Sequence, residues 1–130
     1  MPRASVLGTA FLLASAGSAL AQLQKVNCQT QGEPFYLHQN SKVTHESMMD
    51  ENGCRYSYIS AQSDGRPRVF EKAVIAQAPK KGQLSQPGEF SFFYKPGNGF
   101  KGKDTFAVYI CGTTMHGSGC SRITYNVTVR

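Results

Sequence analysis

The chain has 130 residues, and its 14 lysines and arginines outnumber 8 aspartates and glutamates, so the formal net charge at pH 7 is +6. This length provides one domain with one modest hydrophobic core and leaves no room in the chain for a second. There is no internal repeat, low-complexity tract or linker, and helical periodicity never lasts for three turns, which argues against a helical fold.

The first 21 residues have the pattern of a secretory signal peptide. Arg3 provides the basic start, Val6 to Leu20 is apolar, and Ala19-Leu20-Ala21 fits the small-x-small cleavage rule. The apolar run is shorter than the ~20 residues that a membrane-spanning helix needs. We therefore expect a signal peptide at 1–21 and a mature domain at 22–130, secreted or periplasmic, without a transmembrane segment.

The mature chain is predicted to consist of short strands separated by turns, which is typical of an all-β sandwich. Ser41 to Asn52 is polar and is expected to form a long loop or one helical turn. Val69 to Ala78 is apolar but alternates poorly, which indicates a strand buried on both faces or a β-bulge. The expected strands are Lys25–Thr30, Phe35–His38, Arg55–Ala61, Val69–Ala78, Phe90–Tyr94, Thr105–Cys111 and Arg122–Arg130.

Four cysteines in an exported chain are expected to form two disulfides. Cys111 and Cys120 both lie opposite the apolar phase of their strands. If these strands pair as a hairpin with Gly112 to Gly119 as its loop, the two sulfur atoms lie on the same outer face. We therefore predict a Cys111–Cys120 bond, which leaves Cys28–Cys54. A metal site is the alternative, but none of the spacings is of the CxxC type.

Three motifs follow one another in the second half of the chain: a Pro-x-x-Gly turn at Pro79–Gly82, the strand end Tyr94-Lys95-Pro96, and a glycine corner from Gly99 to Phe106. In this order they resemble the bacterial immunoglobulin-like and cadherin-like domains of secreted and surface proteins, over residues 69–130. The resemblance implies a single immunoglobulin-like antiparallel sandwich of about seven strands in an extracytoplasmic setting. It leaves residues 22–68 unexplained. It carries over no calcium site, because no two aspartates form a DxD pair.

The glycine corner is expected to be structural. Its glycines can take positive φ where the chain reverses, and its first phenylalanine can plug the space beneath the turn. The aspartate can accept hydrogen bonds from nearby backbone N–H groups before the second phenylalanine enters the core. The corner residues are Gly97, Gly99, Phe100, Gly102, Asp104 and Phe106.

Basic residues outnumber acidic ones between Gly65 and Lys103. Lysines lie in both predicted turns of this region, Pro79–Gly82 and Gly97–Lys103. Such a surface attracts anionic polymers. Nucleic acid is not expected as a partner, because the protein is exported and has no evident aromatic stacking array. The candidate anion-binding residues are Arg66, Arg68, Lys80, Lys81, Lys101 and Lys103.

Candidate catalytic and metal-binding residues are sparse. Imidazole and thioether groups suit copper, but the spacing of the histidines and methionines does not by itself bring them together, and we expect no cofactor. Ser118 lacks the context of a nucleophile elbow. The acidic cluster of Glu46, Asp50 and Glu51 lies in a polar segment that is expected to be solvated, which gives little support for acid–base catalysis. The metal candidates considered are His38, His45, His116, Met48, Met49 and Met115.

These features favour a non-enzymatic binding or structural module that contacts a protein or an anionic envelope polymer through its loops. The alternative is an inhibitor that inserts the Gly112 to Gly119 loop into a hydrolase. A periplasmic metal-binding protein is a more remote reading.

Overall fold

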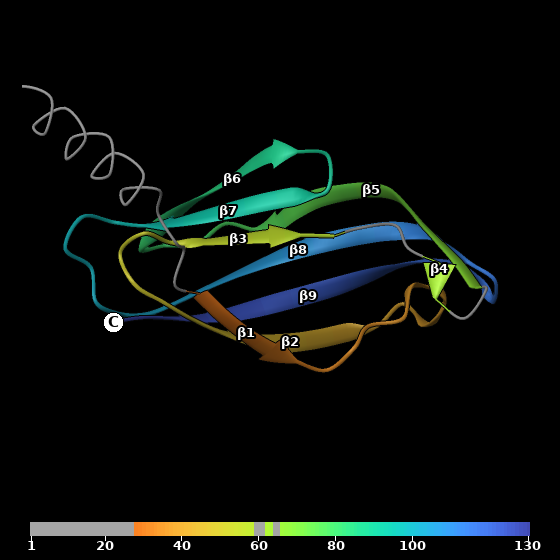
Figure 1. The fold of residues 1–130 in the computed structure, drawn as a ribbon, viewed down its shortest axis with the longest axis horizontal. Helices are drawn as coiled ribbons and strands as arrows, with labels where there is room; N and C mark the ends of the chain where they lie inside the picture. Colours follow the sequence, from red (N-terminus) through yellow and green to blue (C-terminus); the bar gives the residue numbers. More distant parts are fainter. Residues whose placement is uncertain (1–27, 59–61, 64–65) are drawn as a thin grey trace, which may run out of the picture.

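The computed structural model describes residues 28–58, 62–63 and 66–130, with the side chains of 62–63 and 66–68 left out. The described residues form two packed sheets (Figure 1). The larger sheet has the order β1-β2-β9-β8-β5-β4, and the smaller has the order β3-β7-β6. The predicted signal peptide lies outside the described residues. No helix among those described is long and apolar enough to cross a membrane.

The elements are β1 (Cys28–Gly32), the 3-10 helix η1 (Leu37–Gln39), β2 (Lys42–Met49), β3 (Cys54–Ser57), β4 (Gln62–Ser63), β5 (Arg66–Gln77), β6 (Gly82–Gly88), β7 (Ser91–Pro96), β8 (Gly102–Thr114) and β9 (Gly117–Val129). The all-β sandwich expected from the sequence is therefore confirmed. It contains nine strands among the described residues rather than about seven.

The core lies between the two sheets and is formed largely by alternating residues of their strands. The inward residues of β8 and β9 are fully or almost fully buried, and Phe92 and Tyr94 of β7 oppose them at 0% exposure. Strand β5 carries two register shifts against β8, so the β-bulge is confirmed and the alternative of a strand buried on both faces is wrong. The buried residues of β8 and β9 include Phe106, Val108, Ile110, Ile123, Tyr125, Val127 and Val129.

Strand β2 replaces the loop or helical turn expected at Ser41 to Asn52. It pairs in parallel with β9, from Lys42 opposite Arg122 to Met49 opposite Val129, so the sandwich is not wholly antiparallel. The expectation was wrong because the buried face of β2 includes a serine, Ser47. Its hydroxyl is hydrogen-bonded to the Tyr56 hydroxyl of the other sheet at 2.6 Å. A polar residue satisfied by a tertiary partner conceals the period-two pattern.

Two other expectations about elements were also wrong. The predicted strand Phe35–His38 is a loop that ends in η1. The edge strand β6 was not predicted, because Leu84 is its sole large apolar residue. Edge strands are often polar and short, and such a strand leaves little hydrophobic signal.

The predicted Gly112 to Gly119 loop is mostly paired strand. Gly112 faces Gly119 in the β8–β9 ladder, and only the two residues between Thr114 and Gly117 form the turn. The two glycines leave room for η1, whose Leu37 is 1% exposed. A Cβ atom on Gly119 would lie 1.9 Å from the Leu37 carbonyl oxygen. Leu37 of η1 thus packs directly on Gly112 and Gly119, in space that a side chain at either position would occupy.

We predict that Gly119→Ala destabilises the protein by roughly 2 kcal/mol, because the new methyl group must displace the backbone of η1. Gly88→Ala is the matched control, since its nearest neighbour would be the Ser91 side chain at 3.4 Å. Urea denaturation midpoints of the two variants provide the measurement. Equal midpoints would show that η1 does not pack on Gly119.

The structure contains two disulfides, Cys111–Cys120, which the strand phases predict, and Cys28–Cys54, the pair that then remains. Cys111 and Cys120 are register partners in the hairpin. Cys28–Cys54 joins β1 of the larger sheet to β3 of the smaller one. The Cys111–Cys120 bond therefore cross-links a local hairpin, whereas the Cys28–Cys54 bond links the two sheets.

Candidate functional site

Asp104, at the start of β8, organises one end of the sandwich. Its side chain is 8% exposed. One carboxylate oxygen accepts hydrogen bonds from the backbone N–H groups of Lys80 at 3.0 Å and Thr105 at 2.9 Å. The other accepts from the backbone N–H of Lys81 at 2.9 Å and from the Tyr94 hydroxyl at 2.8 Å. The carboxylate thus holds the turn between β5 and β6 against β8.

The charged form of Asp104 is stabilised in place. Burial by itself would raise the pKa of this carboxyl, but hydrogen bonds from the Lys80 backbone, the Tyr94 hydroxyl and two further backbone N–H groups lower the pKa below its ordinary value. Donors that contact an ionised carboxylate favour that form. Both carboxylate oxygens accept hydrogen bonds from groups of the protein itself, so the role of Asp104 at neutral pH is structural.

The glycine corner differs in detail from its expected form. Gly99 and Gly102 take positive φ values of 73° and 136°, but Gly97 does not. A Cβ atom on Gly97 would lie 2.9 Å from the Lys81 carbonyl oxygen, so this glycine permits a close backbone approach instead. The Phe100 ring is partly buried against the core, whereas Phe106 is completely buried.

Six cations lie at this end of the sandwich, where β9 ends, and we call them the basic end. They come from the β5–β6 turn, the end of β7, the β7–β8 loop, the start of β8 and the residue after β9, and all are exposed. The basic end consists of Lys80, Lys81, Lys95, Lys101, Lys103 and Arg130.

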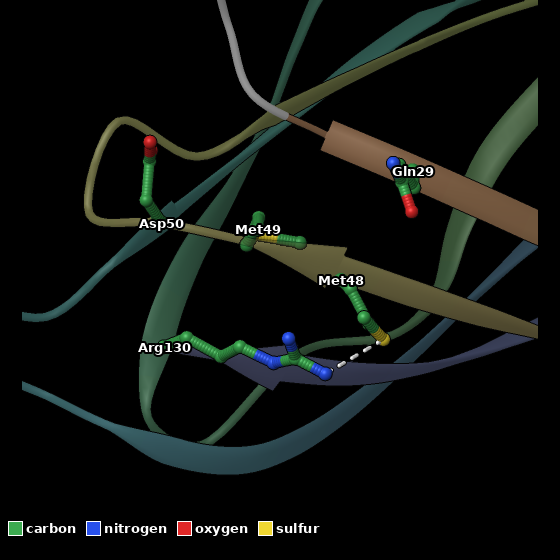
Figure 2. Close-up of a pocket in the computed structure, with 5 residues that line it drawn as sticks. All are labelled: Gln29, Met48, Met49, Asp50 and Arg130. Atoms are coloured by element: carbon green, nitrogen blue, oxygen red, sulfur yellow. Dashed lines mark hydrogen bonds between the residues drawn. The ribbon is translucent and has the colours of Figure 1, made fainter.

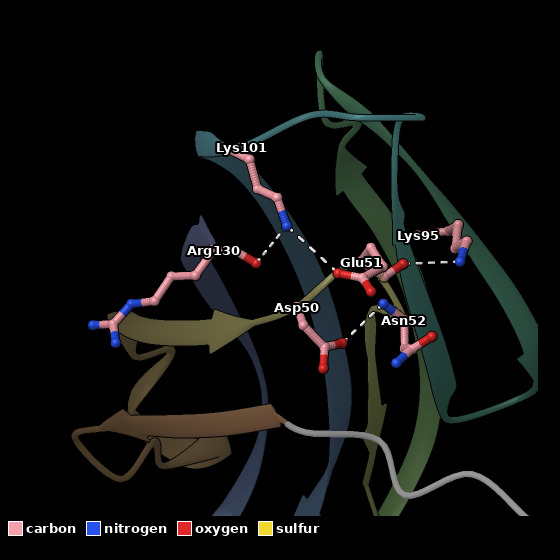
Figure 3. Close-up of polar contacts among 6 residues, drawn as sticks. All are labelled: Asp50, Glu51, Asn52, Lys95, Lys101 and Arg130. Atoms are coloured by element: carbon pink, nitrogen blue, oxygen red, sulfur yellow. Dashed lines mark hydrogen bonds and ion pairs between the residues drawn. The ribbon is translucent and has the colours of Figure 1, made fainter.

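Some of these cations are already engaged (Figure 3). The Lys101 ammonium donates to the main-chain oxygen of Arg130 at 2.8 Å and lies 3.5 Å from the Glu51 carboxylate. The Lys95 ammonium donates to the Glu51 carbonyl oxygen at 2.9 Å. The Lys101–Glu51 contact is the sole ion pair among the described residues, and both side chains are more than half exposed. Such pairs contribute little to stability, so the basic end keeps a positive balance.

The predicted anion-binding residues do not form one patch. Lys80, Lys81, Lys101 and Lys103 gather at the basic end, but Arg68 is paired with Thr114 at the opposite end of the larger sheet. Arg66 and Arg68 have side chains outside the described residues. The β5 strand is twelve residues long, and this length separates charges that are close in sequence.

A pocket of about 170 Å³ borders the basic end (Figure 2). It is lined by Gln29, Met48, Met49, Asp50 and Arg130. The Arg130 guanidinium donates to the Met48 sulfur at 3.5 Å. The Asp50 carboxylate accepts from the Asn52 backbone N–H at 2.9 Å and so belongs to its own turn. The pocket places the thioethers of Met48 and Met49 beside Arg130 of the basic end, a grouping that the sequence did not predict.

Buried tyrosines form a polar network between the sheets. The Tyr56 hydroxyl contacts Ser47, which contacts Thr30 at 2.9 Å, and the Tyr58 and Tyr125 hydroxyls are hydrogen-bonded to each other. Burial raises the pKa of Tyr125 to about 12 and raises the pKa of Tyr56 and of Tyr58 further above the ordinary value. These hydroxyls stay protonated at neutral pH and therefore act as hydrogen-bonding groups of the core.

The three histidines have different surroundings. The Nε2 atom of His45 lies 2.7 Å from the Glu33 carbonyl oxygen, and its ring packs edge-on against Tyr125. His38 of η1 lies beside His116 of the hairpin turn, with ring centroids 5.1 Å apart. Within the described part of the chain, no three or more His, Cys, Asp or Glu side chains gather as a metal-binding group. Met48 and Met49 lie far along β2 from this pair, in the pocket.

No known family model and no curated protein matches this sequence.

Proposed function

We propose that this chain is an exported, non-enzymatic binding module of the immunoglobulin-like type, and that its basic end binds an anionic polymer of the cell envelope or its surroundings. The strand order supports the fold assignment. The smaller sheet, β3-β7-β6, and the neighbouring strands β9-β8-β5 have the arrangement of strands B-E-D and G-F-C in immunoglobulin domains. Two disulfides suit an oxidising compartment outside the cytoplasm.

The observation that carries the binding proposal is the exposure of Lys80 and Lys81 on a turn held rigid by Asp104. Asp104 binds the backbone of this turn and leaves the two ammonium groups to solvent. The turn is thus presented in a fixed orientation without neutralisation of its charges. A rigid cluster of cations attracts a polyanion while losing little conformational freedom on binding. The inhibitor alternative is less well supported, because the hairpin offers a turn of only two residues for insertion.

We predict that replacing Lys80 and Lys81 together by glutamine weakens binding to dextran sulfate by roughly tenfold or more, since a lysine near an anionic surface contributes about 1 kcal/mol. The matched control replaces Lys42 and Lys72, two exposed lysines outside the basic end, in the same way. Binding is measured by calorimetry at several salt concentrations, with polygalacturonate as a carboxylate polymer for comparison.

Both pairs of substitutions change the net charge equally, so they separate a site from a general charge effect. Weakening confined to the Lys80/Lys81 variant, and lost at high salt, supports the basic end. Equal weakening by both variants, or binding that salt does not affect, contradicts the proposal.

A further inference from the structure

A second site lies at the other end of the molecule, where η1 meets the turn between β8 and β9. His38 is in η1, and His116 is in the two-residue turn, 78 positions later in the chain. The packing of Leu37 on Gly112 and Gly119 brings the two rings together. Their planes are tilted by 43°, so the imidazoles are not stacked flat on each other.

The separation of the rings is compatible with two imidazoles bound to one metal ion. A metal–nitrogen bond of about 2.0–2.1 Å places each ring centre about 3.2 Å from the ion, and two rings at the tetrahedral angle then have centres about 5.2 Å apart. The observed separation is 5.1 Å. Ligands at right angles would bring the centres to about 4.5 Å. The geometry thus suits an ion that accepts tetrahedral coordination.

One ring nitrogen of the pair lacks a hydrogen-bond partner among the described residues. The Nδ1 atom of His38 is buried and has no hydrogen-bond partner within the described structure. A buried polar atom without a partner is costly, and a metal ion would supply one. His116 is exposed, and Met115 beside it is 56% exposed, so the turn is open to an ion from solution. The His45 ring differs, because its Nε2 atom already has a partner, the Glu33 carbonyl oxygen.

We propose that His38 and His116 form a surface binding site for a tetrahedral transition-metal ion, with zinc as the ion that best fits the geometry. The protein supplies two imidazoles, and water or an outside ligand completes the coordination. Zinc accepts such mixed coordination when protein ligands leave positions open. The site is independent of the basic end, because it lies at the opposite end of the β8–β9 hairpin.

The test uses untagged, disulfide-bonded protein and zinc chloride. In nitrogen-detected NMR of the three imidazoles, the His38 and His116 resonances should shift together and saturate at one zinc ion per chain, while His45 stays unchanged. Resonances of His38 and His116 that stay in place at stoichiometric zinc would show that the pair is only a packing contact. Shifts of the two rings with different midpoints would also overturn a shared site.

Substitutions provide a second measurement. His116→Gln should weaken zinc binding at least tenfold without changing the urea midpoint, because the side chain is exposed. His45→Gln is the control, since glutamine can still donate to the Glu33 carbonyl oxygen, and it should bind zinc like the wild type. Wild-type zinc affinity in the His116 variant would contradict the proposal.

Discussion

Phe106→Ala is expected to destabilise the protein by about 4 kcal/mol, the largest effect of any single substitution that we predict. The Phe106 side chain is 0% exposed. Its ring lies 5.7 Å from the Tyr94 ring and 5.0 Å from the Tyr125 ring, both in near-parallel orientation, and 5.3 Å from the Tyr56 ring. These partners come from both sheets, so the cavity would open in the middle of the sandwich.

Phe93→Ala is the matched control, because Phe93 lies on the outward phase of β7 and is only half-buried. Removal of a partly exposed ring should cost less than half as much. Urea denaturation curves of both variants provide the free energies of unfolding, with slopes that should match the wild type. Similar losses in the two variants would mean that the inward and outward phases are assigned wrongly.

Asp104→Ala is expected to cost on the order of 3 kcal/mol. The substitution removes an acceptor of four hydrogen bonds and leaves the Tyr94 hydroxyl and the backbone N–H groups of Lys80 and Lys81 without it. An unsatisfied buried donor costs about 1–3 kcal/mol, and partial access of water to the turn reduces the sum. A urea midpoint close to that of the wild type would show that the turn does not depend on this carboxylate.

The isosteric variant Asp104→Asn isolates the contribution of the charge through its pH dependence. The pKa of Asp104 is lower in the folded protein than its ordinary value. The stabilisation is therefore complete above the ordinary value and is lost as the pH falls through the lowered pKa. As the pH falls below about 4, the ordinary value for an aspartate, wild-type stability should therefore decrease more steeply than that of Asp104→Asn. Parallel acid limbs would show that the pKa is not lowered by folding.

Several properties of this protein could be predicted from the sequence by itself. The apolar faces of β8 and β9 could be predicted, because a strand with one buried face must alternate apolar and polar residues. The disulfide between Cys111 and Cys120 followed from the same alternation. The core role of Phe106 did as well. These features depend on the alternation of apolar and polar residues along a strand and on pairing between adjacent strands of one hairpin. Both can be seen in the sequence.

Other properties were decided by the tertiary structure. The inward face of β2 includes a serine whose hydroxyl is satisfied from the other sheet, so no hydrophobic pattern marks the strand. The long β5 sends Arg68 and Lys80 to opposite ends, although the sequence groups them. The His38–His116 pair depends on η1 packing on two glycines. Each of these arises from contacts between segments distant in the chain, and local sequence carries no trace of which distant group will satisfy a polar atom or share a surface.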